Sequence, residues 1–132
     1  MNQNKSSTGL EPNIGGFLSY LFGWLTGLIF LFLEKENKYI RFHALQSIFV
    51  FGTLNILYVL ITVFQGIVIS IAWGITGEEL IIGAITGIFG LFIFLINVAS
   101  LALWITLMIK AYKNETFEIP VAGEIAKKQV GW

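Results

Sequence analysis

The side chains that could do chemistry are few, and the most suggestive ones lie together at His43, Gln46 and Ser47. His43 is the only histidine, and the other two follow it at helical spacing, on the same helix face. A histidine can titrate near neutral pH and could act as a switch or a proton relay. A zinc site is not expected, because zinc needs three or four protein ligands and the chain has no cysteine. We expect His43 and Gln46 to form a polar hinge that bonds to the connection before them or to the C-terminal tail.

No group of residues elsewhere resembles a catalytic centre. The chain contains no Asp, and no Gly-rich phosphate loop follows a strand. The only close acidic pair, Glu78 and Glu79, is explained by a solvated turn between helices. We therefore predict no catalytic residue, no cofactor, no metal and no enzymatic activity. A net charge of zero gives no sign of a nucleic-acid partner, and no pattern indicates a small-molecule ligand.

Three apolar runs must position these side chains. Residues 12–33, 42–77 and 80–109 contain no Asp, Glu, Lys or Arg, and each is at least as long as the roughly 20 residues that cross a bilayer as a helix. The sequence therefore predicts an all-α integral membrane protein, a helical hairpin or bundle with three transmembrane helices. We expect spans at about 14–33, 42–73 and 79–111, the second and third unusually long. The alternative is a fourth helix hidden in the long runs, which would place Glu78 and Glu79 in the bilayer at a cost of several kcal/mol.

The distribution of basic residues predicts an orientation. The connection at residues 34–41 has three Lys or Arg, and the C-terminal region has Lys110, Lys113, Lys127 and Lys128. The connection near residues 74–79 has none, and the N-terminal tail has only Lys5. We expect the protein to lie in the plasma membrane. Because cytoplasmic loops collect Lys and Arg, we expect its N-terminus outside the cell and its C-terminus in the cytoplasm. Residues 1–13 are expected as a flexible polar tail, 14–112 as the membrane domain, and 113–132 as a cytoplasmic tail on the membrane surface.

Small and polar residues mark the expected helix faces. Small residues at steps of about four offer grooves for the backbone of another helix, in the same protomer or in a second copy. They are Gly15, Ser19, Gly23 and Gly27 on the first span, and Gly83, Gly87 and Gly90 on the third. Uncharged polar residues should point inward, either to hydrogen-bond between helices or to line a path between protomers. They are Asn55, Tyr58, Thr62 and Gln65 on the second span, and Asn97 and Ser100 on the third.

The sequence also resembles a known group of membrane proteins over about residues 14–128. The segments that carry the resemblance are Leu18-Ser19-Tyr20-Leu21, residues 39–47 with Arg41, Phe42, His43 and Gln46, Lys110-Ala111-Tyr112, and residues 119–126 with Pro120 and Gly123. Together they are similar to small prokaryotic membrane proteins related to the channel subunit of the chloroplast inner-envelope protein-import machinery. The resemblance implies a helical membrane protein that is not an enzyme. It also implies that the protein forms oligomers and has a role in a channel or in translocation. The chloroplast relatives have four spans, whereas the charge count favours three here.

Two functions of different classes remain open from the sequence. The first is a structural or accessory membrane protein, an oligomerising subunit that packs against itself or another membrane protein. The second is a pore or translocation subunit, in which an oligomer joins the polar stripes into a conduit. In both, the lipid bilayer is the surrounding partner.

Overall fold

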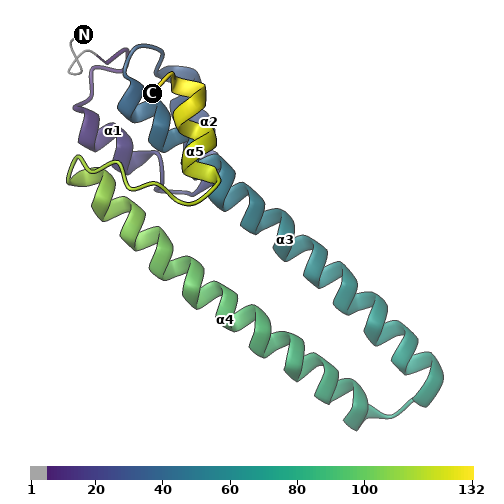
Figure 1. Ribbon diagram of the computed structural model, residues 1–132. Helices are drawn as coiled ribbons and strands as arrows, with labels where there is room; N and C mark the ends of the chain where they lie inside the picture. The colour runs from purple at the N-terminus through teal and green to yellow at the C-terminus, as the bar shows by residue number, and fades with distance from the viewer. Residues whose placement is uncertain (1–5) are drawn as a thin grey trace. The chain divides into compact units, whose positions relative to one another are not determined.

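A computed structural model describes residues 6–132, and the regular elements among these residues are all helices, without a strand. The helices are α1 (Pro12–Leu18), α2 (Trp24–Leu33), α3 (Lys38–Thr76), α4 (Glu79–Tyr112) and α5 (Ala122–Val130) (Figure 1). The expected all-α class is confirmed. Within the described part, α3 and α4 are the two helices long and apolar enough to cross a membrane, and α2 is a shorter apolar helix.

The chain divides into two compact units. Unit 1 combines the chain up to Thr53 with Leu103–Trp132, so it holds α1, α2, α5, the first part of α3 and the last part of α4. Unit 2 is Leu54–Ala102, which contains the rest of α3 and α4 and the connection between them.

The first apolar run does not form one helix. Residues 14–33, expected as a single span, are divided between α1 and α2 by a turn at residues 19–23. Gly23 has a positive φ of 58°, which favours glycine and ends the helical path. Each of the two helices is shorter than the roughly 20 residues of a membrane span. The stripe of Gly15, Ser19, Gly23 and Gly27 is therefore not a single helix face.

Two apolar clusters form the core of unit 1. In the first, Tyr20 packs with Leu107, Met108 and Ala111 of α4, and all four are buried. In the second, Phe42 and Leu45 of α3 pack with Ala126 and Val130 of α5. In Figure 1, α1, α2 and α5 surround the beginning of α3 in this unit. The core thus joins the turn after α1, and α5, to the ends of the two long helices.

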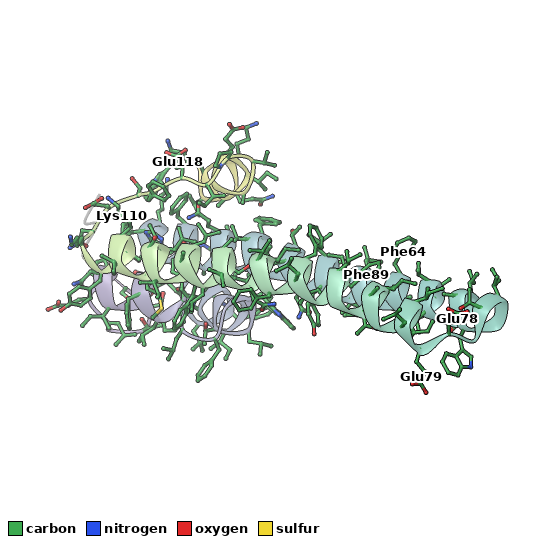
Figure 2. The ribbon with its side chains drawn as sticks, turned by 90° about the horizontal axis from the view of Figure 1, so that it is seen from below. Phe64, Glu78, Glu79, Phe89, Lys110 and Glu118 are labelled. Carbon is green, nitrogen blue, oxygen red and sulfur yellow. The ribbon has the colours of Figure 1, made fainter. Side chains whose placement is uncertain are left out.

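Unit 2 is an antiparallel pair of helix segments. The half-buried residues recur at heptad-like spacing, with Ile61, Gln65, Val68 and Ala72 on α3 and Ile82, Ile85, Phe89, Ile93 and Ile96 on α4. Phe64 and Phe89 bring their ring centroids within 6.1 Å across this seam. Figure 2 shows both rings, and it shows Glu78 and Glu79 at the connection that joins the helices. The other side chains of this unit are mostly apolar and exposed, as lipid requires.

The end of α4 at Tyr112 agrees with the third span expected to about residue 111. Asn114 then adopts a positive φ of 61°. Asparagine tolerates this left-handed conformation, and the Glu115 N–H donates to the carbonyl of Lys110 at 3.0 Å. The C-terminal tail packs α5 onto the first part of α3.

Candidate functional site

Gln46 lies at the centre of a buried polar cluster in unit 1. Its side chain is fully buried, and its Nε2 donates to the carbonyl oxygen of Phe117 at 2.9 Å. Its Oε1 accepts from the Ile119 N–H at 3.1 Å. These two bonds with the C-terminal tail fix which end of the amide is the donor. The expected bond between this region of α3 and the tail is therefore made by Gln46.

The same amide also connects to His43 through Tyr20. Gln46 Nε2 donates to the Tyr20 hydroxyl at 3.0 Å. The Tyr20 hydroxyl lies 3.0 Å from His43 Nδ1, and the two groups are hydrogen-bond partners. His43 therefore bonds to the turn between α1 and α2, and it makes no described hydrogen bond to the tail.

The second nitrogen of His43 faces an apolar and aromatic environment. Nε2 is buried and has no hydrogen-bond partner among the described residues. The rings of Tyr39 and Phe42 lie edge-on to the imidazole, with centroids at 4.4 Å and 5.0 Å. No three His, Cys, Asp or Glu side chains between residues 6 and 132 gather into a group that could hold a metal ion. The cluster joins α3 to the C-terminal tail and to the turn between α1 and α2.

Glu34 is the centre of a second polar cluster, where α2 meets the connection to α3. It is fully buried, and its carboxylate accepts from the Ser6 hydroxyl and from the backbone N–H groups of Ser7, Glu36 and Asn37. Burial raises the pKa of Glu34, but the hydrogen bond from Ser6 and those from the backbone outweigh it and lower the pKa to about 2. The carboxylate is therefore ionised at neutral pH and ties three pieces of chain together.

This second cluster brings the N-terminal segment to the first connection. Within the tail expected over 1–13, residues 1–5, Lys5 among them, lie outside the described part, but Ser6–Thr8 bond to Glu34 and Pro12 already begins α1. The run between the two segments turns back at Gly23. The orientation expected from the charge count, with the N-terminus outside, stays a prediction.

The remaining residues of the family-like signature fasten the same unit. Arg41 Nη1 donates to the carbonyl oxygen of Glu34 at 2.8 Å. Phe42 is buried and stacks on Trp132, with 5.5 Å between the ring centroids. A Cβ atom at Gly123 would lie 2.8 Å from Gln46 Oε1, so only glycine fits there. Pro120 is exposed, in the turn that precedes α5.

The small residues separate into filled and open positions. A Cβ atom at Gly15 would lie 2.5 Å from the Ile40 side chain, and one at Gly27 would lie 2.8 Å from the carbonyl oxygen of Ala44. In unit 2, by contrast, Cβ atoms at Gly83, Gly87 and Gly90 would meet nothing within 4 Å. The first group lets helices of unit 1 approach closely, whereas the second is not used within the described chain.

The polar residues of unit 2 are not brought together. Asn55 and Tyr58 are exposed, and Gln65 and Ser100 are half-buried. Thr62 Oγ1 donates to carbonyl oxygens of its own helix, and Asn97 Nδ2 donates to Ile93 O at 2.8 Å in the same way. No hydrogen bond described for these side chains joins α3 to α4.

Several residues of the two clusters were missed from the sequence. Tyr20 was noted only as part of a resemblance, and Glu34 only as one charge in a connection. A weak signal existed for the second cluster, because Asn37 accepts from the Ile40 N–H at 3.1 Å as a helix-capping residue does. Nothing in the local pattern pointed to Tyr20, because its partners lie 23 or more positions away in the chain.

Comparison with known proteins adds a family. A family model described as the magnetosome magnetite crystal formation protein family matches residues 8–126. A UPF0132 membrane protein of Methanocaldococcus jannaschii is 41% identical over 124 residues, which cover 94% of this chain and 93% of that protein. A UPF0132 membrane protein of Archaeoglobus fulgidus is 32% identical over 122 residues, covering 92% of this chain and 98% of that protein. No solved structure matches. This helical membrane protein belongs to the magnetosome magnetite crystal formation protein family.

Proposed function

We propose that the protein is a small structural membrane protein, a subunit that packs against a second copy of itself through the open face of α4. One observation carries the proposal: Gly83, Gly87 and Gly90 offer a face on which no heavy atom lies within 4 Å of a Cβ position. In unit 1, Gly15, Gly16, Gly27 and Gly123 are filled by neighbouring side chains or backbone, whereas all the glycines of unit 2 are open; among these, Gly83, Gly87 and Gly90 share one face of a helix. Small residues at this spacing let two helix backbones approach in lipid.

Asn97 extends the same face of α4. It follows Gly90 at seven residues, which is two helical turns, and its side chain is exposed. Its amide bonds only to the carbonyl of Ile93 in its own helix, among the described contacts. A hydrogen bond from an amide to a partner on a neighbouring helix stabilises helix association in lipid by roughly 1 kcal/mol. A second copy of α4 would bring such a partner to Asn97.

The polar clusters of unit 1 fit a structural role. The hydrogen bonds described for the polar side chains of these clusters are made within the chain, as for Gln46, Tyr20 and Glu34. The family description concerns magnetite crystals, but no metal-holding group of side chains gathers within residues 6–132, and mineral chemistry is not part of the proposal. We place the protein in the plasma membrane as a multi-pass protein, with its basic C-terminal tail in the cytoplasm.

The proposal is tested by the mass of the protein in native lipid particles. We expect the wild-type protein to be an oligomer, and Gly87→Leu to lose that association because the larger side chain fills the groove. Ala99→Leu is the matched control, since it adds similar bulk at an exposed position outside the stripe. A wild-type monomer, or an oligomer that Gly87→Leu leaves unchanged, would contradict the proposal.

A pore is the second candidate. It is favoured by Asn55, an exposed amide on an apolar helix that makes no described hydrogen bond. In an oligomer such side chains could line a shared path. Ion leak in liposomes that Asn55→Leu abolishes would support the pore, and a tight bilayer around a stable oligomer would support the structural role.

A further inference from the structure

The turn between α1 and α2 receives hydrogen bonds from distant side chains. Ser47 Oγ on α3 donates to the carbonyl oxygen of Gly23 at 2.9 Å. Trp104 Nε1 on α4 donates to the carbonyl oxygen of Tyr20 at 2.7 Å. Each carbonyl also accepts a backbone N–H, Tyr20 O from Gly23 at 2.9 Å and Gly23 O from Gly27 at 3.2 Å. The two side chains therefore use the remaining acceptor capacity of these oxygens and tie the turn to α3 and α4.

A third side chain bonds to the same turn. Thr26, in the first turn of α2, is buried, and its Oγ1 accepts from the Phe22 N–H at 3.1 Å. The same oxygen lies 3.2 Å from the carbonyl oxygens of Ser19 and Gly23 and shares its proton between them. In hydrocarbon, irregular backbone is tolerated only where protein groups bond to it. The Phe22 N–H and the carbonyls of Ser19, Tyr20 and Gly23 have such partners.

The outer face of this segment is apolar. None of the ten residues of α2 is charged. Seven large apolar side chains of α1, the turn and α2 are exposed: Ile14, Leu21, Phe22, Leu25, Ile29, Phe32 and Leu33. Phe22 in the turn is 71% exposed and Phe32 is 74% exposed. A ten-residue helix is about 15 Å long, half of a hydrocarbon core of about 30 Å. α2 is therefore long enough to enter one leaflet but not to cross the bilayer.

Both ends of the segment return to one place. Ser6–Thr8 before α1 bond to Glu34 just after α2. Asn13 Nδ2 in α1 donates to the carbonyl of Tyr112, the last residue of α4, at 3.3 Å. The entrance and the exit of the segment therefore lie beside the first connection and the C-terminal end of α4, all within unit 1.

We propose that α1, the turn and α2 form a re-entrant hairpin, which enters the cytoplasmic leaflet and returns to the cytoplasm, with lipid acyl chains covering the exposed face of α2. The described Lys and Arg residues all belong to unit 1, and cytoplasmic parts of membrane proteins collect Lys and Arg. They are Lys35, Lys38, Arg41, Lys110, Lys113, Lys127 and Lys128. Both termini then lie in the cytoplasm, and α3 and α4 are the two complete spans. The connection between them, with Glu78 and Glu79, lies outside.

Single cysteines test this arrangement, because the chain has none of its own. Glu11→Cys, Lys35→Cys and Lys128→Cys are exposed positions in unit 1, and Glu78→Cys marks the opposite end of the spans. A membrane-impermeant maleimide should label the first three only from the cytoplasmic side and Glu78→Cys only from outside. Phe22→Cys should react from neither side until detergent dissolves the bilayer.

Two results would overturn the proposal. Glu11→Cys labelled from the same side as Glu78→Cys would mean that residues 12–33 cross the membrane. Phe22→Cys labelled from the cytoplasmic side without detergent would mean that the turn lies in water. Leu25→Cys, on the exposed face of α2, gives the same readout if the Phe22 variant does not fold.

Discussion

At the residue scale, Gln46 determines how three segments meet. Its amide has two N–H donors and one carbonyl acceptor, and these bond to Phe117, Tyr20 and Ile119. Because every group is used, no substitution keeps all three bonds. An isosteric carboxylate would point an acceptor at the Phe117 carbonyl, which also can only accept. The residue thus explains why the tail packs on α3.

We predict that Gln46→Glu releases the C-terminal tail. The change replaces two donors by an acceptor and buries a charge, which should cost about 2–4 kcal/mol. In inside-out vesicles, trypsin should then cleave after Lys127 and Lys128 faster than in the wild type. Gln129→Glu makes the same change at an exposed position of α5 and should leave the rate unaltered. Unchanged cleavage in Gln46→Glu would show that the amide does not hold the tail.

Glu34 predicts a dependence of stability on pH. Its pKa is about 2 in the folded protein against a usual value of 4.5, so its ionised form stabilises the fold. This contribution is fully present above about pH 4.5 and is lost as the pH falls toward 2.

Glu34→Gln should therefore lower the free energy of unfolding by about 1–3 kcal/mol at neutral pH. In detergent, the difference in melting temperature between the wild type and Glu34→Gln should become smaller as the pH falls below 4.5. Glu124→Gln, at an exposed carboxylate, is the control. If the difference in melting temperature stays constant with pH, the ionised carboxylate of Glu34 does not provide the stability that Glu34→Gln loses.

At the element scale, apolar runs predicted the long helices but not the break. Uncharged stretches of 30 residues or more leave few alternatives to α3 and α4, because lipid forces the backbone to bond within each helix. The break at residues 19–23 depends on Ser47 and Trp104, which lie 24 and 84 positions from the carbonyls they bind. The spacing of apolar residues along 14–33 does not show such long-range hydrogen bonds. The Gln46 and Glu34 clusters were not predicted for the same reason.

The packing of α2 on α3 gives a prediction for Gly27. In Gly27→Ala the new Cβ atom would lie 2.8 Å from the carbonyl oxygen of Ala44, and a backbone atom cannot move aside cheaply. We expect a loss of about 1–3 kcal/mol, measured as a lower melting temperature in detergent. Gly66→Ala, where a Cβ atom meets nothing within 4 Å, is the control and should be neutral or slightly stabilising. Equal effects of the two substitutions would contradict the close contact.

At the scale of the whole molecule, charge and open surface are distributed differently over the two units. The described basic residues and the polar clusters belong to unit 1, whereas unit 2 has only Glu78 and Glu79 as charges. Unit 2 also has the open glycine stripe. The sequence showed the stripe and the charge asymmetry, but it left open whether the glycines were filled within the chain.

The central claim is that two copies meet along this stripe, and cysteine cross-linking in membranes tests it most directly. Because the chain has no native cysteine, any disulfide in a single-cysteine variant must join two copies. We predict that mild oxidation links Gly87→Cys into a covalent dimer, whereas Ala99→Cys, outside the stripe, stays monomeric. A Gly87→Cys variant that remains monomeric while Ala99→Cys dimerises would place the contact elsewhere, and no dimer from either would contradict self-association through α4.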